Sequence, residues 1–171
     1  MKILVAVDMQ NDFIDGALGT KEAQEMLPRA VEKVKGFDGK VLFTRDTHGE
    51  NYLETQEGKK LPVKHCIRET EGWQIHESLC PYCTEQPVDK VTFGSVELGR
   101  RMAQWDREEK IDSIELIGLC TDICVIANAM ILKAFLPETE ISVDSACCAG
   151  VTPESHARAL KAMEACQITI R

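Results

Sequence analysis

No stretch of this sequence is apolar for long enough to cross a membrane. A membrane-spanning helix needs about 18 consecutive apolar residues, and the 171 residues contain no such run. The N-terminal stretch MKILVAVDMQNDF also lacks the cleavage-site pattern of a secretory signal, and acidic residues follow its apolar run directly. We therefore expect a cytoplasmic protein without a membrane partner.

Basic residues are too few to balance the acidic ones. The 20 Lys and Arg face 28 Asp and Glu, which gives a formal net charge of -8. This charge repels polyanions, so we expect no nucleic acid and no anionic membrane surface as a partner. The sequence also has no internal repeat, and 44% apolar content over 171 residues is typical of one soluble domain, here residues 1–171.

A second C-x-x-C pair is missing as well. Cys80 and Cys83 have the spacing of a redox motif or of half a zinc site, but no partner pair follows and the motif does not open a helix after a strand. The favoured interpretation is a pair without a redox or metal role, and both of those roles stay open. Cys147, Cys148 and Cys166 lie at predicted strand and helix ends, where we expect them to pack.

Apolar, β-branched runs alternate with segments of helical spacing along the chain. The alternation predicts an α/β fold, Rossmann-like, in which a doubly wound, mostly parallel sheet of six strands carries helices on both faces. The stretch 49–86 keeps no period, which is typical of a functional loop. Strands are predicted at 3–7, 41–44, 88–93, 114–119, 141–143 and 167–170, and helices at 26–37 (Pro28 in the first turn), 97–109, 121–136 and 153–165.

Cys124 follows the predicted strand 114–119 and lies in the first turn of the next helix. The unpaired N–H groups at a helix N-terminus stabilise an anion, so this position biases the thiol toward thiolate. Cys124 is therefore a candidate nucleophile. The alternative is a small apolar core residue, which free cysteines usually are.

Two charged residues at predicted strand ends are candidates for proton transfer and charge stabilisation. Asp8 directly follows a buried strand, where a low dielectric raises the pKa of a carboxyl group into the range of a general acid or base. Its alternatives are a strand-end cap or a partner for Arg45. Lys90 lies in the predicted strand 88–93, between the apolar residues Val88 and Val91, and could hold Asp8 and Cys124 as anions, or be a solvated lysine on a short edge strand.

Two histidines and one carboxylate form a candidate metal site. Asp46 and His48 follow a predicted strand, and His65 lies seventeen residues after His48. Such a set leaves coordination positions open, and zinc, iron and manganese all suit these ligands. The alternative is two ordinary loop histidines. His76 and His156 have no such neighbours, and we expect them to be structural or exposed.

Five motifs carry a resemblance to a known family. In order and spacing they resemble the isochorismatase-like cysteine hydrolases, a superfamily that includes nicotinamidases and pyrazinamidases. The resemblance covers essentially the whole chain, and five motifs in register are a far more specific signal than one. The motifs are VDMQNDF (7–13), TRDTH (44–48), KHC (64–66), DKVTFGS (89–95) and GLCTDICV (118–125).

The resemblance implies a catalytic triad of Asp8, Lys90 and Cys124. Asp8 would take the thiol proton and pass it to the leaving amine, while Lys90 would orient and stabilise the charges. The backbone N–H groups of Cys120 and Cys124 would form the oxyanion hole, and the Leu119–Cys120 peptide bond would be cis.

The resemblance also implies a metal cofactor and a reaction. Asp46, His48 and His65 match metal ligands, with zinc the first expectation and iron or manganese the alternatives, and Phe13 matches a residue of the substrate pocket. The implied function is cysteine-dependent, metal-assisted hydrolysis of nicotinamide to nicotinate and ammonia by a homo-oligomer. The alternatives are the same triad acting on another small amide, carbamoyl or ureido compound, and a ligand- or metal-binding protein without turnover.

Two positions depart from the nicotinamidase pattern. Thr47 stands where an aromatic residue usually follows the metal-binding Asp, and Pro62 stands where a tryptophan usually stacks on the substrate ring. Stacking contributes beyond the burial of area, so the substrate stays open at this stage. Phe13, Tyr52 and Trp73 are the candidates to replace the missing rings.

Overall fold

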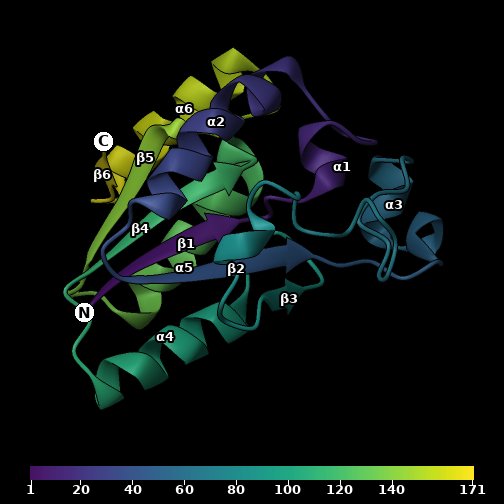
Figure 1. Ribbon diagram of the computed structural model, residues 1–171. Helices are drawn as coiled ribbons and strands as arrows, with labels where there is room; N and C mark the ends of the chain where they lie inside the picture. The colour runs from purple at the N-terminus through teal and green to yellow at the C-terminus, as the bar shows by residue number, and fades with distance from the viewer.

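A six-stranded sheet forms the centre of the computed structural model, which describes all 171 residues (Figure 1). The strands lie in the order β3-β2-β1-β4-β5-β6, and every neighbouring pair is parallel. The predicted α/β fold with six parallel strands is therefore confirmed. The strands are β1 (Lys2–Val7), β2 (Lys40–Asp46), β3 (Val88–Lys90), β4 (Ser113–Leu119), β5 (Glu140–Ala149) and β6 (Thr169–Ile170).

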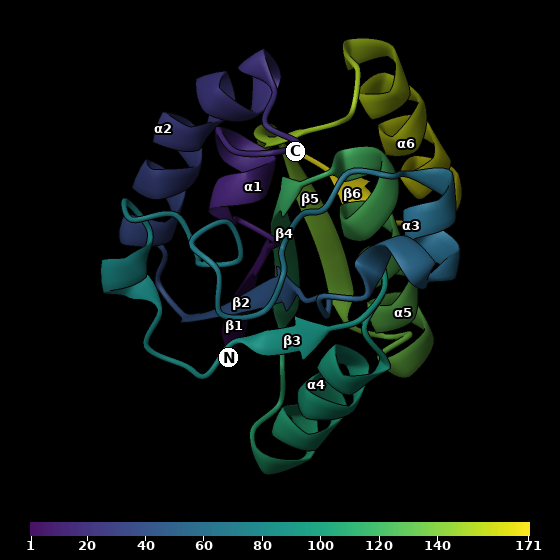
Figure 2. The ribbon, with the colours of Figure 1, turned by 90° about the vertical axis from the view of Figure 1, so that its right-hand side faces the viewer.

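Helices cover both faces of the sheet, as predicted. Figure 2 shows α1 (Asn11–Ile14) and α2 (Lys21–Lys35) on one side, and α4 (Val96–Glu108), α5 (Ile126–Phe135) and α6 (Pro153–Ala165) on the other. Alternate strand residues enter the two cores, because successive side chains point to opposite faces. Leu4 of β1 packs in the α2-side core and Val5 packs in the opposite core. None of these helices is both long and apolar enough to cross a membrane.

Helix α2 begins earlier than the sequence prediction. The hydroxyl of Thr20 accepts a hydrogen bond from the backbone N–H of Ala23 at 3.1 Å, which caps a helix that starts at Lys21. Pro28 therefore lies inside the helix, and its predicted place in the first turn is wrong. The buried face already includes Ala23 and Met26, so the apolar spacing extends N-terminally of the predicted start.

Strand β5 is much longer than the predicted 141–143 and continues to Ala149. Cys147 and Cys148 are consecutive residues of this strand and enter the α2-side core and the opposite core respectively, so they pack as expected. Cys166 is exposed at the C-terminal end of α6, and its predicted packing role is wrong.

The stretch 49–86 is largely irregular, as predicted. It contains only short helical segments: η1 (Tyr52–Glu54), α3 (Gln56–Lys60) and η2 (Cys80–Tyr82). Isolated bridges tie it to the carboxyl ends of β1 and β2, between Gln10 and Ile75 and between His48 and Ile67. These bridges place the stretch against the edge of the sheet where ligands bind in such folds.

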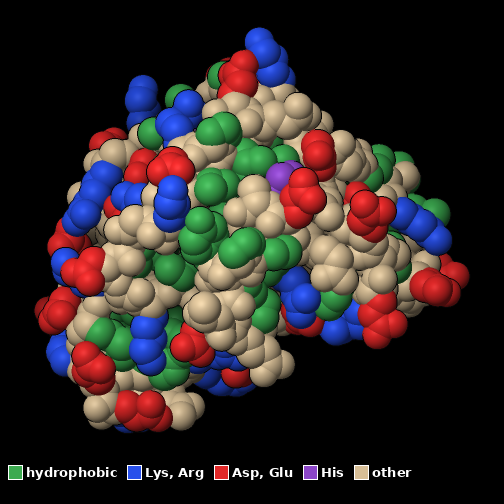
Figure 3. Space-filling model, in the orientation of Figure 1, with side chains coloured by type: hydrophobic (Ala, Val, Ile, Leu, Met, Phe, Trp, Pro, Cys, Tyr) green, Lys and Arg blue, Asp and Glu red, His purple; other side chains and the backbone are tan.

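On the face seen in Figure 1, charged side chains surround a central patch of apolar ones (Figure 3).

Candidate active site

Asp8 is the first residue after β1 and is completely buried. It has a left-handed φ of 48°, which costs a non-glycine residue about 1–2 kcal/mol. Its Oδ2 lies 2.6 Å from Lys90 Nζ, and its Oδ1 accepts a hydrogen bond from Thr44 Oγ1 at 2.6 Å. Arg45, the alternative partner, pairs instead with Asp89 at 2.7 Å. The strand end therefore directs this carboxylate inward.

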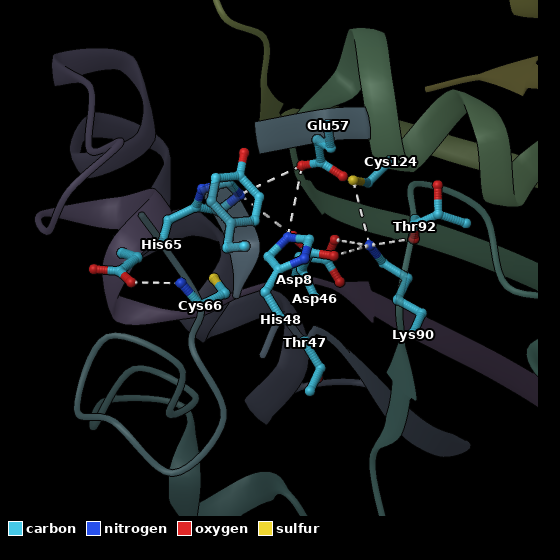
Figure 4. Close-up of polar contacts among 12 residues, drawn as sticks. Asp8, Asp46, Thr47, His48, Glu57, His65, Cys66, Lys90, Thr92 and Cys124 are labelled. Atoms are coloured by element: carbon cyan, nitrogen blue, oxygen red, sulfur yellow. Dashed lines mark hydrogen bonds and ion pairs between the residues drawn. The ribbon is translucent and has the colours of Figure 1, made fainter. Parts of the chain in front are cut away.

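Lys90 is the last residue of the edge strand β3, yet only 3% of its surface is exposed. Its Nζ lies 3.4 Å from Asp46 Oδ1, and it donates hydrogen bonds to Cys124 Sγ at 3.4 Å and to the Thr92 carbonyl at 3.2 Å (Figure 4). This lysine therefore joins two carboxylates and a thiol in one buried cluster. The alternative of a solvated edge lysine is wrong.

Burial and charge shift the pKa values of Asp8 and Lys90. Burial raises the pKa of Asp8, and the positive charge of Lys90 opposes part of that shift. Burial alone would lower the pKa of Lys90, but the charges of Asp8, Cys124 and Asp46 raise it well above its usual range. Lys90 therefore stays protonated, while Asp8 moves toward the range in which a carboxyl group exchanges protons near neutral pH.

Cys124 lies in η3 (Thr121–Val125), a single π-helical turn between β4 and α5. The residue is 4% exposed. The peptide bond between Leu119 and Cys120, just before this turn, is cis. Gly118 has a φ of 118°, and a Cβ there would lie 2.1 Å from the carbonyl oxygen of Val7. Only glycine permits this close approach of β4 to β1, which brings the turn beside Asp8.

The resting form of Cys124 differs from the sequence prediction. Burial raises the pKa of its thiol well above the usual value, the charge of Asp8 adds to this shift, and the charge of Lys90 opposes only part of it. The direction of this shift is opposite to the predicted bias toward thiolate, and desolvation is its largest cause. A nucleophilic Cys124 would need a base, and the nearby carboxylate of Asp8 is placed to be one.

Four side chains form a group that could hold a metal ion. The ligand atoms of Asp46, His48, Glu57 and His65 all lie within 4.8 Å of one another. His48 Nε2 and His65 Nε2 lie 2.8 and 3.5 Å from Asp46 Oδ2, and 3.6 and 3.7 Å from Glu57 Oε1. Asp46, His48 and His65 were predicted from the sequence as metal ligands, whereas Glu57 was not. No spacing signal marks Glu57, because α3 lies in the stretch without a period.

The electrostatics and orientation of this group suit a divalent cation. Burial alone would raise the pKa of Asp46, but hydrogen bonds from His48 and His65 and the charge of Lys90 hold it well below its usual range. Burial, followed by the charge of Asp46, raises the pKa of Glu57. His65 Nδ1 contacts the Val63 carbonyl at 2.8 Å, which leaves Nε2 facing the group, as in metal-binding histidines. Two imidazoles and two carboxylates match the ligands that zinc prefers.

A cavity of about 160 Å³ lies between the metal-binding group and Cys124. Phe13 lies in its wall, as the resemblance implied, and most of the other wall residues are apolar. Tyr52 and Trp73 do not replace the missing stacking rings: Tyr52 packs on His48 and His65, and Trp73 donates a hydrogen bond to Thr47 Oγ1 at 2.8 Å. The lining residues are Phe13, Leu18, Thr20, Asp46, Glu57, Leu61, His65, Phe93, Cys120, Ile123, Cys124 and Val151.

Comparison with known proteins identifies the family to which this architecture and site belong. The family model of the isochorismatase domain matches residues 2–171 of this sequence. The chain belongs to the isochorismatase family.

Several relatives of this isochorismatase-family chain have named activities. The nicotinamidase/pyrazinamidase of Mycobacterium tuberculosis is 26% identical and aligns over 99% of this chain and 98% of its own. The structure of the pyrazinamidase/nicotinamidase from Streptococcus mutans matches with a TM-score of 0.83, 26% identity and complete coverage (100%) of both chains. The pyrazinamidase of Pyrococcus horikoshii in complex with zinc gives a TM-score of 0.79 at 26% identity and covers 99% of this chain and 98% of its own.

Other polar residues near the site of this isochorismatase-family protein have structural contacts. Asp12 Oδ2 accepts a hydrogen bond from the backbone N–H of Cys66 at 2.7 Å, which fixes the loop that carries His65. His76 contacts Ser78 Oγ at 2.9 Å and His156 contacts Thr121 Oγ1 at 2.8 Å, in line with the structural roles expected of both. The titratable residues around the cavity are therefore Cys120 and those of the Asp8 cluster and the metal-binding group.

Proposed function

We propose that this isochorismatase-family protein hydrolyses nicotinamide to nicotinate and ammonia, with Cys124 as the nucleophile. The observation that carries the proposal is a single cavity that has Cys124 on one side and the metal-binding group on the other. Asp8 and Lys90 lie directly behind the thiol. Relatives that align over nearly the whole chain are named nicotinamidases.

In the first chemical step, Cys124 Sγ attacks the carboxamide carbon and forms an S–C bond. Asp8 accepts the thiol proton as this bond forms, which suits a carboxylate whose pKa is raised and a thiol that is protonated at rest. The carbonyl electron pair moves to oxygen, where the backbone N–H groups of Cys120 and Cys124 donate hydrogen bonds to it. Lys90 keeps its proton and balances the negative charge.

In the second step, the C–N bond breaks and Asp8 returns its proton to the leaving nitrogen. Ammonia departs and a thioester remains on Cys124. A water molecule then attacks the thioester carbon while Asp8 accepts its proton. The C–S bond breaks, the thiol regains the proton, and the carboxylic acid leaves as nicotinate.

Asp46, His48, Glu57 and His65 would hold a divalent metal, with zinc the first choice and iron or manganese the alternatives. When bound, the metal supplies a Lewis acid for the pyridine nitrogen of the substrate. Zinc in the Pyrococcus horikoshii pyrazinamidase supports this choice. Phe13 and the apolar wall would pack on the ring and keep bulk water from the thiol.

We also infer the setting in which the protein works. Eight free cysteines support a reducing compartment, the cytoplasm, and a net charge of -8 supports a small-molecule partner rather than nucleic acid or an anionic membrane. Exposed apolar side chains on α4 and α5, Val96 and Phe135, support a homo-oligomer. One sheet with a core on each face supports one domain over residues 1–171.

The cavity wall favours a second candidate substrate class. Leu61 and Ile123 supply aliphatic surface to the cavity wall. The hydroxyl of Thr47 already accepts a hydrogen bond from Trp73. A wall of this kind also accepts a small amide, carbamoyl or ureido compound without an aromatic ring. The chemistry at Cys124 would be unchanged.

Ammonia release from a panel of amides by the purified, zinc-loaded protein tests the proposal. The panel compares nicotinamide and pyrazinamide with benzamide, which has no ring nitrogen, and with an N-carbamoyl amino acid. We expect nicotinamide to react faster than benzamide, and chelation of the metal to slow nicotinamide more than benzamide. Hydrolysis of the carbamoyl compound with none of nicotinamide would overturn the proposal in favour of the second class.

A further inference from the structure

Cys80 and Cys83 lie outside the cavity that contains Cys124. They belong to the turn around η2, the short teal segment in front of β2 in Figure 1, within the region of the apolar patch in Figure 3. Cys80 is exposed and Cys83 is half-buried against the α2-side core. The exposure of Cys80 sets this pair apart from the buried cysteines of the chain.

The backbone holds the two cysteines at a spacing that a disulfide can bridge. The N–H of Cys83 donates to the carbonyl of Cys80 at 3.1 Å, which closes a four-residue turn. Such a turn keeps its first and fourth Cα atoms within about 7 Å, and disulfides join Cα atoms about 4.4–6.8 Å apart. The thiols now donate weak hydrogen bonds to the carbonyls of Ile75 (3.2 Å) and Glu85 (3.7 Å), which a disulfide would replace.

Metal binding is a weaker explanation for this pair. A structural zinc site needs four ligands, and the one group of three or more metal-capable residues in the structure is that around Asp46. The nearby His76 contacts Ser78 through its Nδ1. Two accessible sulfurs without a third ligand favour redox chemistry over zinc.

No other cysteines of the chain combine proximity with accessibility in this way. Four are buried, at positions 66, 124, 147 and 148, and Cys120 lies in the cavity wall. Cys166 is exposed, but it lies alone at the end of α6. The turn around η2 is thus the place where a solvent thiol or disulfide meets two neighbouring sulfurs.

We propose that Cys80 and Cys83 form a reversible dithiol–disulfide pair that exchanges with small disulfides. The exposed Cys80 loses its proton to solvent, and its sulfur attacks one sulfur of the small disulfide. The S–S bond of the small disulfide breaks, the leaving sulfur takes up a proton from solvent to give one small thiol, and a mixed disulfide remains on Cys80. Cys83 then loses its proton to solvent and attacks Cys80 Sγ, which releases the second small thiol and closes the Cys80–Cys83 bond. Two protein thiols are oxidised and one small disulfide is reduced to two thiols.

The surroundings of Cys80 select the charge of its exchange partner. Cys80 lines a surface hollow of about 680 Å³ together with Asp12, Asp15, Glu71 and Glu77. Four carboxylates repel an anionic disulfide such as glutathione disulfide, and this repulsion weakens as salt screens it. An uncharged disulfide is therefore the better partner at low ionic strength.

Oxidation of the reduced, full-length protein by 2-hydroxyethyl disulfide tests the proposal. Samples at graded ratios of this disulfide to 2-mercaptoethanol are acid-quenched, alkylated, cut with trypsin and weighed by mass spectrometry. The fragment 69–90 contains Cys80 and Cys83 as its only cysteines, and the fragment 162–171 contains Cys166 alone. We expect the first fragment to lose two hydrogens at a ratio at least about tenfold lower than the ratio that modifies Cys166, because its second step is intramolecular.

Matched variants separate the pair from a reactive single thiol. In Cys83→Ser, Cys80 should stop at the mixed disulfide and need the same ratio as Cys166, whereas Cys166→Ser should leave the pair unchanged. Glutathione disulfide should oxidise the pair more slowly than 2-hydroxyethyl disulfide at low salt, with the difference shrinking at high salt. Separate mixed disulfides on Cys80 and Cys83, or two free thiols when Cys166 is already modified, would overturn the proposal.

Discussion

The two ends of the sheet contain the same charge arrangement with different surroundings. At the carboxyl end, Lys90 lies between Asp8 at 2.6 Å and Asp46 at 3.4 Å. At the amino end, Lys33 of α2 lies between Glu115 at 2.9 Å and Asp144 at 2.8 Å. Each lysine thus bridges two carboxylates that come from the strands.

Burial and neighbours distinguish the two clusters. The side chain of Lys90 is 1% exposed and donates a hydrogen bond to a thiol in the wall of the cavity. The side chain of Lys33 is 28% exposed, and the nearby thiol of Cys147 does not line that cavity. Burial alone would lower the pKa of Lys33, but the hydrogen bonds that Lys33 donates to Asp144 and Glu115 outweigh burial and raise it. A lysine between two carboxylates is therefore no sign of catalysis by itself. We propose catalysis only for the cluster that also contains Cys124.

Replacing each lysine by methionine should separate the clusters most strongly. Lys90→Met should lower kcat/KM for nicotinamide by at least about 100-fold, since it removes a preorganised charge beside the reacting atoms. Lys33→Met should stay within about twofold of the native value, because it lies at the far end of the sheet. Steady-state kinetics measure both. Circular dichroism checks that the variants fold. If Lys90→Met does not fold, Lys90→Arg, which keeps the charge, takes its place in the kinetic comparison. Equal losses of kcat/KM in Lys90→Met and Lys33→Met would contradict the distinction between the two clusters.

Loss of the metal should have the next largest effect, again at the carboxyl end only. Removing zinc with a chelator should lower nicotinamide hydrolysis by about 10–100-fold, and Glu57→Gln should weaken zinc binding by a similar factor. Calorimetric zinc titration of the apoprotein checks the second effect. Glu115→Gln, at the amino end, is the control and should bind zinc as tightly as the native chain. Unchanged zinc affinity in Glu57→Gln would exclude Glu57 from the ligand set.

The pH profile should show a moderate effect that depends on Asp8. Because burial raises the pKa of Asp8, its carboxylate becomes protonated at a higher pH than usual, and the base is lost as pH falls through that raised value. The acid limb of kcat/KM should therefore lie above about pH 3.9, the ordinary value for Asp. Lys33→Met should keep the same limb. An acid limb at or below the ordinary value would contradict the role of Asp8.

A substitution in the amino-end cluster should change the stability of the protein rather than its activity. Lys33→Met should lower the free energy of unfolding by about 1–3 kcal/mol, because it leaves the buried Glu115 with only the more distant Arg171, at 3.8 Å, as an ion-pair partner. Urea unfolding measures this loss. The pKa of Lys33 is raised in the folded state, so its contribution is complete below the unfolded pKa and disappears as pH rises through the folded value above 10.5. The native chain and the variant should therefore converge in stability at strongly alkaline pH.

Strand ends explain why much of the site could be predicted. Asp8, Asp46 and Lys90 each end or follow a strand, and parallel strands place such residues at one edge of the sheet. Glu57 could not be predicted, because it comes from a short helix in an irregular stretch whose path depends on tertiary contacts. Trp73 could not be placed for the same reason, and it binds Thr47 instead of lining the cavity.

The protonation of Cys124 shows a second limit of sequence reasoning. A helix N-terminus can be read from the sequence, but the desolvation of the thiol depends on strands and loops far away in the chain. Burial dominates, so the resting group is a thiol. The proposed thioester chemistry therefore requires proton transfer to Asp8 rather than a preformed anion.

The kinetics of Cys124→Ala give the most direct test of the central claim. Cys148→Ala is the matched control, since Cys148 is a second buried cysteine of the same core. With zinc bound and both variants folded, we predict that Cys124→Ala releases ammonia from nicotinamide at least about a thousandfold more slowly than the native protein. Cys148→Ala should stay within about threefold. Native-like ammonia release by Cys124→Ala would contradict the account.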